Sequence, residues 1–488
     1  MTLRQWKNIL YFDLDRKKNL GNQIEEGITR EIENGRLRAG MLLPGYRELA
    51  AYLGVSRNTI ALVYAELGSK GILKSVKRKG TFVAEAMLNK NSLPKKIEHP
   101  KGCSFPFNNF TGDIINTEVP PGHWRIKVDD GYPDPKLAPS GRFVATYKQM
   151  AFRTTRQKKA EYNSGNSFKQ LTSETCRWLQ SRRSLNMDDR NLCLIISSRM
   201  ALYMVAQVLL QKGDIVVVEE PGAAICWQTF QRAGAELFPI IVDNEGIRTD
   251  ILERELQNKK IKAVYVTPGC QYPTTVTLSK PRRDHLLKLS EQYGFAIIET
   301  DNDHEFYYSP TITLPLATKN IEGNVIYIGN LSRMMAPLNL ICCVAGPAAF
   351  IKSLSLLFYS IYQRADAVLE LTVADMMRTD VIGRAARSSQ RAYEKKRNNM
   401  ASYIEKYLRP YVSYNLPDGG LSFWLTFDKK SNIENLRKRL SEQNIWLPPT
   451  NLVAYESISP NALRIGYASL SRSEAENTII AIADYFKK

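Results

Sequence analysis

The sequence lacks the patterns that mark several large classes of protein. Its seven cysteines form no C-x-x-C pair, and a long chain with few, scattered cysteines is typical of a reduced, cytoplasmic protein. Only four histidines occur and none has ligand-like spacing, so we expect no metal site. No run of about 18 apolar residues is present, and the polar start MTLRQWKN has no signal-peptide pattern. We therefore expect neither a membrane span nor secretion.

Acidic residues are also under-represented. Lys plus Arg number 67 against 49 Asp plus Glu, which gives a net charge of +18. Such an excess favours a polyanionic partner, most commonly nucleic acid, although composition alone leaves an anionic membrane surface or a merely solvated exterior open. A length of 488 residues suggests two to four domains at about 100–200 residues each.

The first 84 residues form one candidate domain, with fifteen basic and eight acidic residues, a net of +7. Apolar periodicity predicts helices over Leu20–Asn34, Arg47–Leu53 and Arg57–Leu67. Between the last two, Gly54 ends one helix and Ser56 is a suitable N-cap for the next. This is helix-turn-helix spacing.

Two short strands, Gly71–Leu73 and Thr81–Val83, are predicted to follow, joined by the basic turn at residues 76–80. Arg57, Asn58 and Thr59 open the second helix of the motif, where they could reach base edges in a major groove. The basic turn suits a phosphate backbone. An ordinary helical hairpin with solvated charges is the alternative interpretation.

This segment resembles the winged-helix domain of GntR-type bacterial regulators. The motif LPGYRELAAYLGVSRNTIALVYAEL, followed by KGIL and KGTFVAE, carries the resemblance over Leu14–Ala84. Gly45-Tyr46 departs from it, because the family usually has two small hydroxyl residues there. The resemblance implies that double-stranded DNA is bound by four parts of this domain. These are Arg47 of the preceding helix, Ser56, the start of the recognition helix (Arg57–Leu67), and the basic turn between the two strands, which is the family's wing. The predicted DNA-binding residues are Arg47, Ser56, Arg57, Asn58, Thr59, Lys77, Arg78, Lys79, Gly80 and Thr81.

The rest of the chain reads as α/β. After a stretch rich in Pro, Lys and Asn, interpreted as a linker over residues 85–127, short β-branched runs alternate with amphipathic stretches. This alternation predicts a mostly parallel sheet covered by helices. The predicted strands are Leu192–Ser197, Asp214–Val218, Glu236–Val242, Ala263–Val266, Ala296–Glu299 and Val325–Ile328. The tail, from about residue 380 to 488, reads as a smaller α+β subdomain.

Residues 128–488 are similar to the aminotransferase-like domain of MocR-type regulators, which join a GntR winged helix to an aminotransferase of fold type I. The shared segments include GYPDPKLAPS, KGDIVVVEEPG, VYVTPGCQYPTTVTLS, FAIIETDNDHEFYY, VIYIGNLSRMMAP and LRIGYASL. The resemblance implies a bacterial homodimer and, as the family's cofactor, pyridoxal phosphate.

The cofactor positions implied by this resemblance are substituted. Pyridoxal phosphate needs a lysine amine for its Schiff base, and the family's lysine position is Arg333, whose guanidinium stays protonated. The acid, the ring-facing tyrosine, the phosphate-binding arginine, the stacking aromatic residue and a histidine are replaced as well. These positions are Thr300, Asn302, Leu340, Ala223 and Cys270, respectively. We therefore expect no bound cofactor and no catalytic residue.

Arg464, in the LRIGYASL segment, lies where this fold commonly holds the arginine that pairs with a substrate carboxylate. A structural salt bridge is an equally open interpretation. Together, Arg464, Arg199 and Arg333 predict a positively charged cleft for an anionic small-molecule effector. The preferred function is a transcription regulator that senses a ligand non-covalently. The alternatives are a pyridoxal-phosphate-dependent aminotransferase-like enzyme, a cofactor-sensing regulator, and an architectural DNA-binding dimer whose cleft stays empty.

Overall fold

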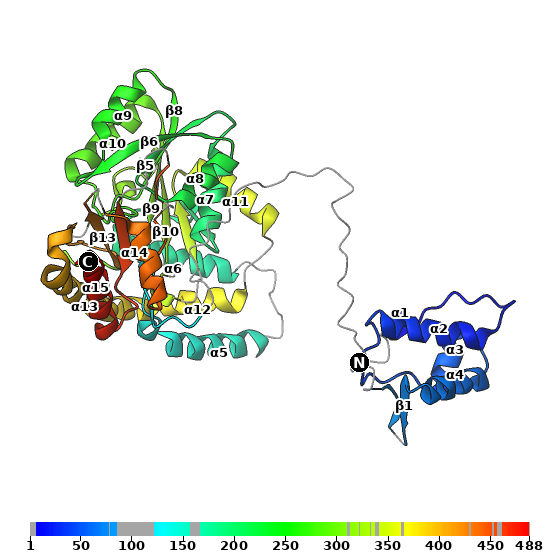
Figure 1. Ribbon diagram of the computed structural model, residues 1–488. Helices are drawn as coiled ribbons and strands as arrows, with labels where there is room; N and C mark the ends of the chain where they lie inside the picture. The colour runs from blue at the N-terminus through cyan, green and yellow to red at the C-terminus, as the bar shows by residue number, and fades with distance from the viewer. Residues whose placement is uncertain are drawn as a thin grey trace. The chain divides into compact units, whose positions relative to one another are not determined.

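The chain forms two compact units, Met1–Gly112 and Asp113–Lys488, in a computed structural model (Figure 1). The structure describes residues 6–77, 79–84, 122–156, 166–309, 313–321, 323–331, 333–336, 341–362, 366–428, 431–450, 453–455 and 461–487. Within these ranges no helix has the length and apolarity needed to cross a membrane.

The N-terminal unit is a helical bundle with a two-stranded wing. Its helices are α1 (Trp6–Ile9), α2 (Leu20–Glu33), α3 (Tyr46–Leu53) and α4 (Arg57–Ser69), and its antiparallel strands are β1 (Leu73–Val76) and β2 (Gly80–Val83). Gly54 ends α3 in the left-handed conformation, and the Ser56 hydroxyl accepts from the Thr59 amide to cap α4. Ile24, Leu49 and Ile60 are fully buried in the shared core.

An eight-stranded sheet organises the second unit. Its order is β4-β11-β10-β9-β8-β5-β6-β7. The central pairs are parallel, while β11 runs antiparallel to both neighbours and β7 runs antiparallel to β6. The strands are β4 (Leu192–Ile195), β5 (Ile215–Glu220), β6 (Glu236–Asp243), β7 (Gly246–Ile247), β8 (Ile261–Val266), β9 (Ala296–Asp301), β10 (Val325–Asn330) and β11 (Cys342–Ala345).

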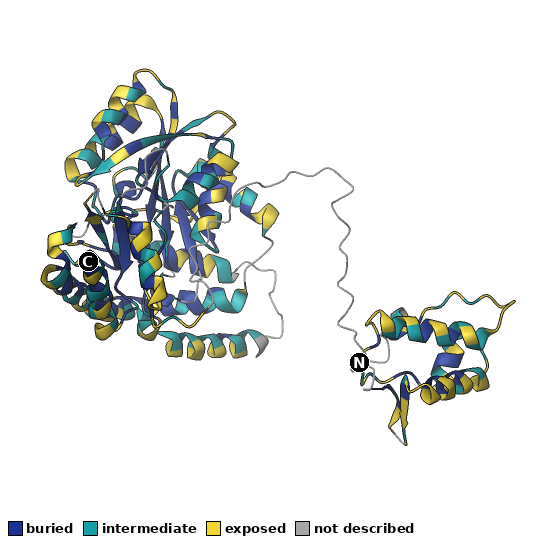
Figure 2. Ribbon diagram, viewed as in Figure 1, coloured by how far each residue is buried: buried dark blue, intermediate teal, exposed yellow. Residues whose placement is uncertain are grey.

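Helices cover both faces of this sheet, as the mostly buried strands in Figure 2 show. One core cluster packs against α6, α9, α10 and α12, and the other against α7, α8 and α11. The helices are α5 (Ser140–Arg156), α6 (Asn166–Arg183), α7 (Ser198–Leu209), α8 (Ala224–Arg232), α9 (Thr249–Leu256), α10 (Lys280–Tyr293), α11 (Ala348–Ile361) and α12 (Ala367–Arg378). Short 3-10 turns span Pro135–Leu137, Asp189–Asn191, Leu316–Thr318, Arg333–Met335 and Arg409–Tyr411.

A smaller α+β layer with its own core completes the unit. Helix α13 (Val381–Tyr403), continued by a π turn at Ile404–Leu408, packs with α15 (Arg472–Phe486). The strands are β12 (Val412–Ser413), β13 (Ser422–Phe427), β14 (Ile445–Trp446) and β15 (Ala462–Gly466), and α14 is Ile433–Glu442. Strand β3 (Ile126–Lys127) pairs with β14, so these two residues of the stretch interpreted as linker belong to the second unit.

Candidate functional site

The first candidate site is the exposed face of α4 in the N-terminal unit. Arg57 and Asn58 project into solvent at the start of this helix, while Ile60 and Tyr64 on its other face are buried. Arg47, in the first turn of α3, is exposed as well. No carboxylate among the described residues forms an ion pair with Arg47 or Arg57. Their positive charge is therefore available to an external anion.

The wing contributes further exposed cations but departs from the sequence prediction at one residue. Lys77, Lys79 and Gly80 are exposed in the β1–β2 turn, whereas Arg78 lies outside the described residues. Thr81 was predicted to contact DNA, but its side chain is buried and its hydroxyl shares a hydrogen bond with that of Ser75 (3.0 Å). This contact corrects the prediction for the Thr81 side chain.

The second candidate site is a small cavity at the end of the central strands of the large sheet. Its volume is about 100 Å³. It is lined by residues of β9 and of the turns after β8, β9 and β10, with one arginine from β15 and two residues of the segment after β3. The lining residues are Asp130, Tyr132, Thr267, Cys270, Tyr272, Thr300, Asp301, Asn302, Asp303, Tyr307, Arg333 and Arg464. No lysine is among them.

Arg464 is held by groups of the chain itself. Its Nε lies 2.9 Å from Oδ1 of Asp130, and its Nη1 donates to the Pro273 carbonyl at 2.7 Å. The Tyr272 hydroxyl donates to the other Asp130 oxygen at 2.8 Å. The Tyr272 ring also faces the guanidinium at 4.8 Å. The salt bridge that the sequence left open is therefore present, with Asp130 as the partner.

Arg333 is paired as well. Its Nε lies 2.7 Å from Oδ1 of Asp303, and its Nη2 donates to the Gly131 carbonyl at 2.6 Å. The two predicted arginines thus meet at one cavity, and each has a carboxylate partner from this chain. Arg199 does not join them, because it is exposed on α7 and does not line the cavity. Its predicted place in the cleft is corrected accordingly.

Strand β9 presents alternate residues to opposite faces of the sheet, which separates Thr300 from Asp301. Ile298 belongs to one core cluster and Ile297 to the other. Asp301 pairs with Arg183 of α6 (2.7 Å) and accepts a hydrogen bond from the Tyr327 hydroxyl (3.0 Å). Its charge is thereby neutralised from the face that α6 covers.

The other positions that the sequence analysis assigned to the family's cofactor site are distributed as follows. Thr300, Asn302 and Cys270 line the cavity, Ala223 precedes α8 as its N-cap, and Leu340 lies outside the described residues. Burial raises the pKa of the Cys270 thiol to about 12, and the nearby Asp303 carboxylate acts in the same direction. Cys270 is thus held as a neutral thiol, which is a weak nucleophile.

Sequence reasoning missed the residues that neutralise the arginines. Asp303 and Tyr272 lie in the shared segments, and Asp130 immediately precedes one, but nothing local pairs Asp130 with a residue 334 positions later. The described residues contain no group of three or more His, Cys, Asp and Glu side chains placed to hold a metal ion.

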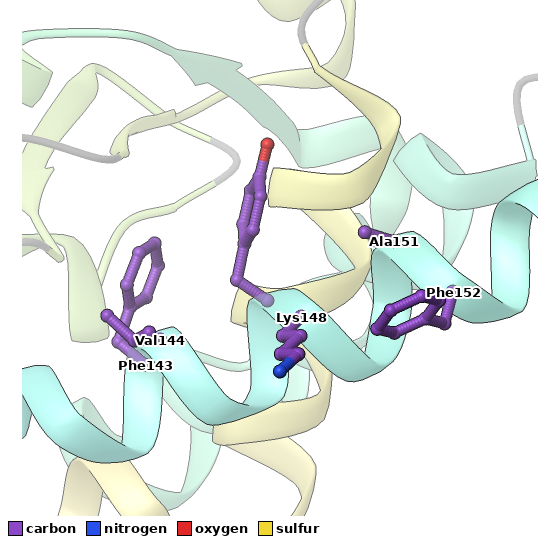
Figure 3. Close-up of a pocket in the computed structure, with 6 residues that line it drawn as sticks. Phe143, Val144, Lys148, Ala151 and Phe152 are labelled. Carbon is purple, nitrogen blue, oxygen red and sulfur yellow. The ribbon is translucent and has the colours of Figure 1, made fainter.

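A third feature is an apolar groove of about 450 Å³ on the surface of α5 (Figure 3). Phe143, Val144, Tyr147 and Phe152 line it. Val144 is 64% exposed and Phe152 is 55% exposed. Large apolar side chains gathered on one exposed helix face mark an interaction surface.

Comparisons with known proteins place both units in families. Residues 20–83 match the model of bacterial regulatory proteins of the gntR family, and residues 135–482 match that of aminotransferase class I and II. The chain belongs to the aminotransferase class I and II family. With the gntR match at its N-terminus it has the architecture of the MocR-type GntR regulators, and it is a MocR-type transcription regulator with an aminotransferase-like domain.

Relatives along the whole length share this MocR-type architecture. The probable rhizopine catabolism regulatory protein MocR of Rhizobium meliloti is 23% identical, covering 98% of this chain and 96% of the relative. The regulator TauR of Rhodobacter capsulatus is 25% identical, covering 93% and 96%. Among solved structures, an archaeal alanine:glyoxylate aminotransferase superposes with a TM-score of 0.68 at 23% identity, covering 74% of this chain and 90% of its own. That likeness establishes fold type I for the second unit.

Proposed function

We propose that this MocR-type regulator binds operator DNA through α4 and the wing, and that its aminotransferase-like unit forms a homodimer and senses a ligand without covalent chemistry. The observation that carries the second half is the pairing at the cavity: the family's lysine position is Arg333, and its guanidinium is already bound to Asp303 and to the Gly131 carbonyl. A protonated guanidinium supplies no amine for a Schiff base.

The DNA-binding half rests on the gntR match and on side chains that are free to act. Arg57 and Asn58 at the start of α4 suit base edges, and Arg47, Lys77 and Lys79 suit phosphates. Ser56 and Thr59 are engaged in the helix cap, so we assign them to positioning the helix. Gly80 contributes only backbone to the wing.

The residues at the cavity do not fit pyridoxal phosphate, the family's usual cofactor. No lysine lines the described cavity, and Thr300 offers a hydroxyl where the ring nitrogen requires a carboxylate. Of the two acids that flank Thr300 in β9, Asp301 is committed to Arg183 and Tyr327. The other, Glu299, accepts from two backbone amides of the 3-10 turn at Leu316–Thr318. Ala223 has no ring to stack on the cofactor. We therefore assign no catalytic residue and no cofactor to this chain.

The homodimer is supported by the apolar groove on α5. Exposed apolar side chains also occur on α11, where Leu356, Tyr359 and Ile361 are more than half exposed. A second copy of the chain would bury such surfaces, which is typical of homodimer interfaces. An operator with two-fold symmetry is expected from such a dimer.

DNA binding is tested by selecting operator sequences with the full-length protein and then measuring fluorescence anisotropy. Arg57→Ala should weaken specific binding by about 1–3 kcal/mol and relax specificity at one base pair. Arg36→Ala is the control, because Arg36 is an exposed arginine of the same unit that pairs with Glu31. Equal operator affinity of Arg57→Ala and the wild type would overturn the assignment of α4 as the recognition helix.

The absence of Schiff-base chemistry is tested separately. The purified full-length protein is incubated with pyridoxal phosphate, reduced with borohydride and examined by peptide mass spectrometry. We expect no stoichiometric pyridoxyl adduct on any lysine of the chain. A stoichiometric pyridoxyl adduct on one lysine, with aldimine absorption before reduction, would favour the aminotransferase-like enzyme instead.

A further inference from the structure

The segment Asp129–Tyr132 lies between the two cavity arginines and contacts both. Arg464 forms its ion pair with the Asp130 carboxylate, and Arg333 donates to the Gly131 carbonyl. The Asp130 side chain is 21% exposed and that of Arg464 is 7% exposed. A buried guanidinium without a counterion is strongly unfavourable, so Asp130 satisfies a requirement that Arg464 imposes.

The Asp130 carboxylate is held in the way that a protein holds a carboxylate ligand. One oxygen lies 2.9 Å from the Arg464 guanidinium, and the other accepts from the Tyr272 hydroxyl at 2.8 Å. Both oxygens therefore have a charged or hydroxyl donor contributed by the cavity wall. An external carboxylate that approached Arg464 would meet Asp130 in the same place.

The segment is anchored tightly on the other side. The Asp129 carboxylate accepts from the Gly131 and Tyr132 amides at 2.8 and 2.9 Å, and the Asp129 carbonyl accepts from the Gly466 amide at 2.9 Å. Gly131 has a φ of +94°, and a Cβ there would lie 2.1 Å from the Ser422 hydroxyl oxygen. Only glycine lets the backbone pass this close to Ser422. Gly131 therefore fixes the local backbone conformation from which Asp130 would be displaced.

This segment also belongs to the first described stretch of the aminotransferase-like unit, which starts at Asp113. Strand β3 pairs with β14 at Ile126–Lys127, and Asp130 follows only three residues after Lys127. Asp130 is therefore close in sequence to the stretch that joins the two units. No other described segment lining the cavity has this position in the chain.

We propose that Asp130 is an internal carboxylate ligand of Arg464, which occupies the cavity in the free protein, and that a carboxylate effector binds by displacing it. The proposal rests on the proposed function, because it needs the cavity to be a non-covalent ligand site. It adds the residue of the chain that a carboxylate ligand must displace from Arg464. The apparent affinity for the ligand is the intrinsic affinity multiplied by the fraction of molecules in which Asp130 has left Arg464.

The charges at the cavity support displacement rather than simple addition. Arg333 and Arg464 are balanced by Asp303 and Asp130, while Asp301 is balanced by Arg183. A carboxylate added to this set would bring an uncompensated negative charge into a largely buried site. Releasing Asp130 toward solvent restores the balance at Arg464.

The test is isothermal titration of the full-length protein with glutarate as the carboxylate probe. Asp130→Asn should bind glutarate at least tenfold more tightly than the wild type, because the internal competitor has lost its charge. Asp130→Asn combined with Arg464→Met should lose this binding. Asp188→Asn is the matched control, because it removes an exposed, arginine-paired carboxylate of the same unit.

A second variant guards against misfolding of Asp130→Asn. Asp130→Ala removes the carboxylate and leaves both Arg464 and the Tyr272 hydroxyl to the probe, so an affinity gain in the same direction is expected. Amide hydrogen exchange at Gly131 and Tyr132 should accelerate on glutarate addition. Operator binding is measured in parallel on every variant.

Tighter glutarate binding by both variants, together with faster exchange at Gly131, supports the proposal. Glutarate affinity that is unchanged or weaker in both variants, or undetectable throughout, overturns it, and retained operator binding then leaves the regulator function intact. Loss of operator binding by the wild type itself would instead refute the proposed function.

Discussion

The buried ion pair between Arg183 and Asp301 gives the sharpest stability prediction. The Arg183 side chain is 2% exposed and that of Asp301 is 6% exposed, with 2.7 Å between Nη2 and Oδ2. Among the described residues, Arg183→Met leaves the buried Asp301 carboxylate with the Tyr327 hydroxyl as its hydrogen-bond donor. Removing one member of such a pair costs about 3–5 kcal/mol of the free energy of unfolding.

That cost converts into a measurable melting shift. The second unit has about 380 residues, so its unfolding entropy is about 0.8 kcal/mol/K, and 3–5 kcal/mol lowers Tm by about 4–6 °C. Differential scanning calorimetry of the full-length protein measures this shift. Arg183→Met combined with Asp301→Asn should recover most of the loss, because the remaining amide is neutral and still accepts from Tyr327.

An exposed ion pair supplies the control. Lys319 and Asp284 are 2.6 Å apart, with side chains 62% and 49% exposed, so Lys319→Met should change the stability by at most about 1 kcal/mol. Our reasoning would be refuted if Arg183→Met lowered Tm no more than Lys319→Met does. It would equally fail if the double variant lost as much as the two single variants added together.

Three further outcomes are expected. Lys79→Ala should weaken operator binding about equally for all sequences and reduce the slope of log affinity against log salt by about 1, measured by anisotropy at several salt concentrations; an unchanged slope would remove Lys79 from the interface. Burial raises the pKa of Glu219 to about 7, so the folded state retains a proton that the unfolded chain releases above its ordinary pKa of 4.5. Stability should therefore fall between about pH 4.5 and 7, by about 3 kcal/mol for this group, and Glu219→Gln should flatten that part of the urea-denaturation profile; an equally steep profile in Glu219→Gln would contradict this. Val144→Glu with Phe152→Glu should raise the dimer dissociation constant at least tenfold in analytical ultracentrifugation, whereas the exposed change Gln149→Glu on the same helix should not; equal constants would exclude this face of α5.

The secondary structure was predictable where periodicity and end signals coincide. The recognition helix was expected at Arg57–Leu67 and spans Arg57–Ser69, because Ser56 fixes its start and the apolar spacing fixes its buried face. The last helix begins at Arg472, where Ser471 and Glu474 form a capping box of the kind that a sequence can show. Strand β11 was not predicted, although Cys342–Ala345 is as short and as fully buried as β4, which was.

The cavity was predictable in its arginines but not in their partners. Arg333 and Arg464 stand out from their motifs, and the structure brings both to one site. Their counterions depend on how the segment after β3 and the turn after β9 pack against the small α+β layer. Asp130 and Arg464 are 334 positions apart in the sequence, and Asp303 and Arg333 come from different turns, so no local pattern of hydrophobicity or spacing encodes these contacts.

The pairing of charges also changes how the excess of positive charge should be interpreted. In the aminotransferase-like unit the cavity arginines are neutralised by carboxylates of the chain, so they add nothing to the field that an approaching polyanion meets. In the N-terminal unit Arg47, Arg57, Lys77 and Lys79 are exposed, and none pairs with a described carboxylate. The net charge of +18 is therefore a poor measure of the DNA footprint, and the unpaired cations of α3, α4 and the wing are a better one. A salt dependence set by this group alone, and left unchanged by Arg333→Met, is what this distribution of charge requires.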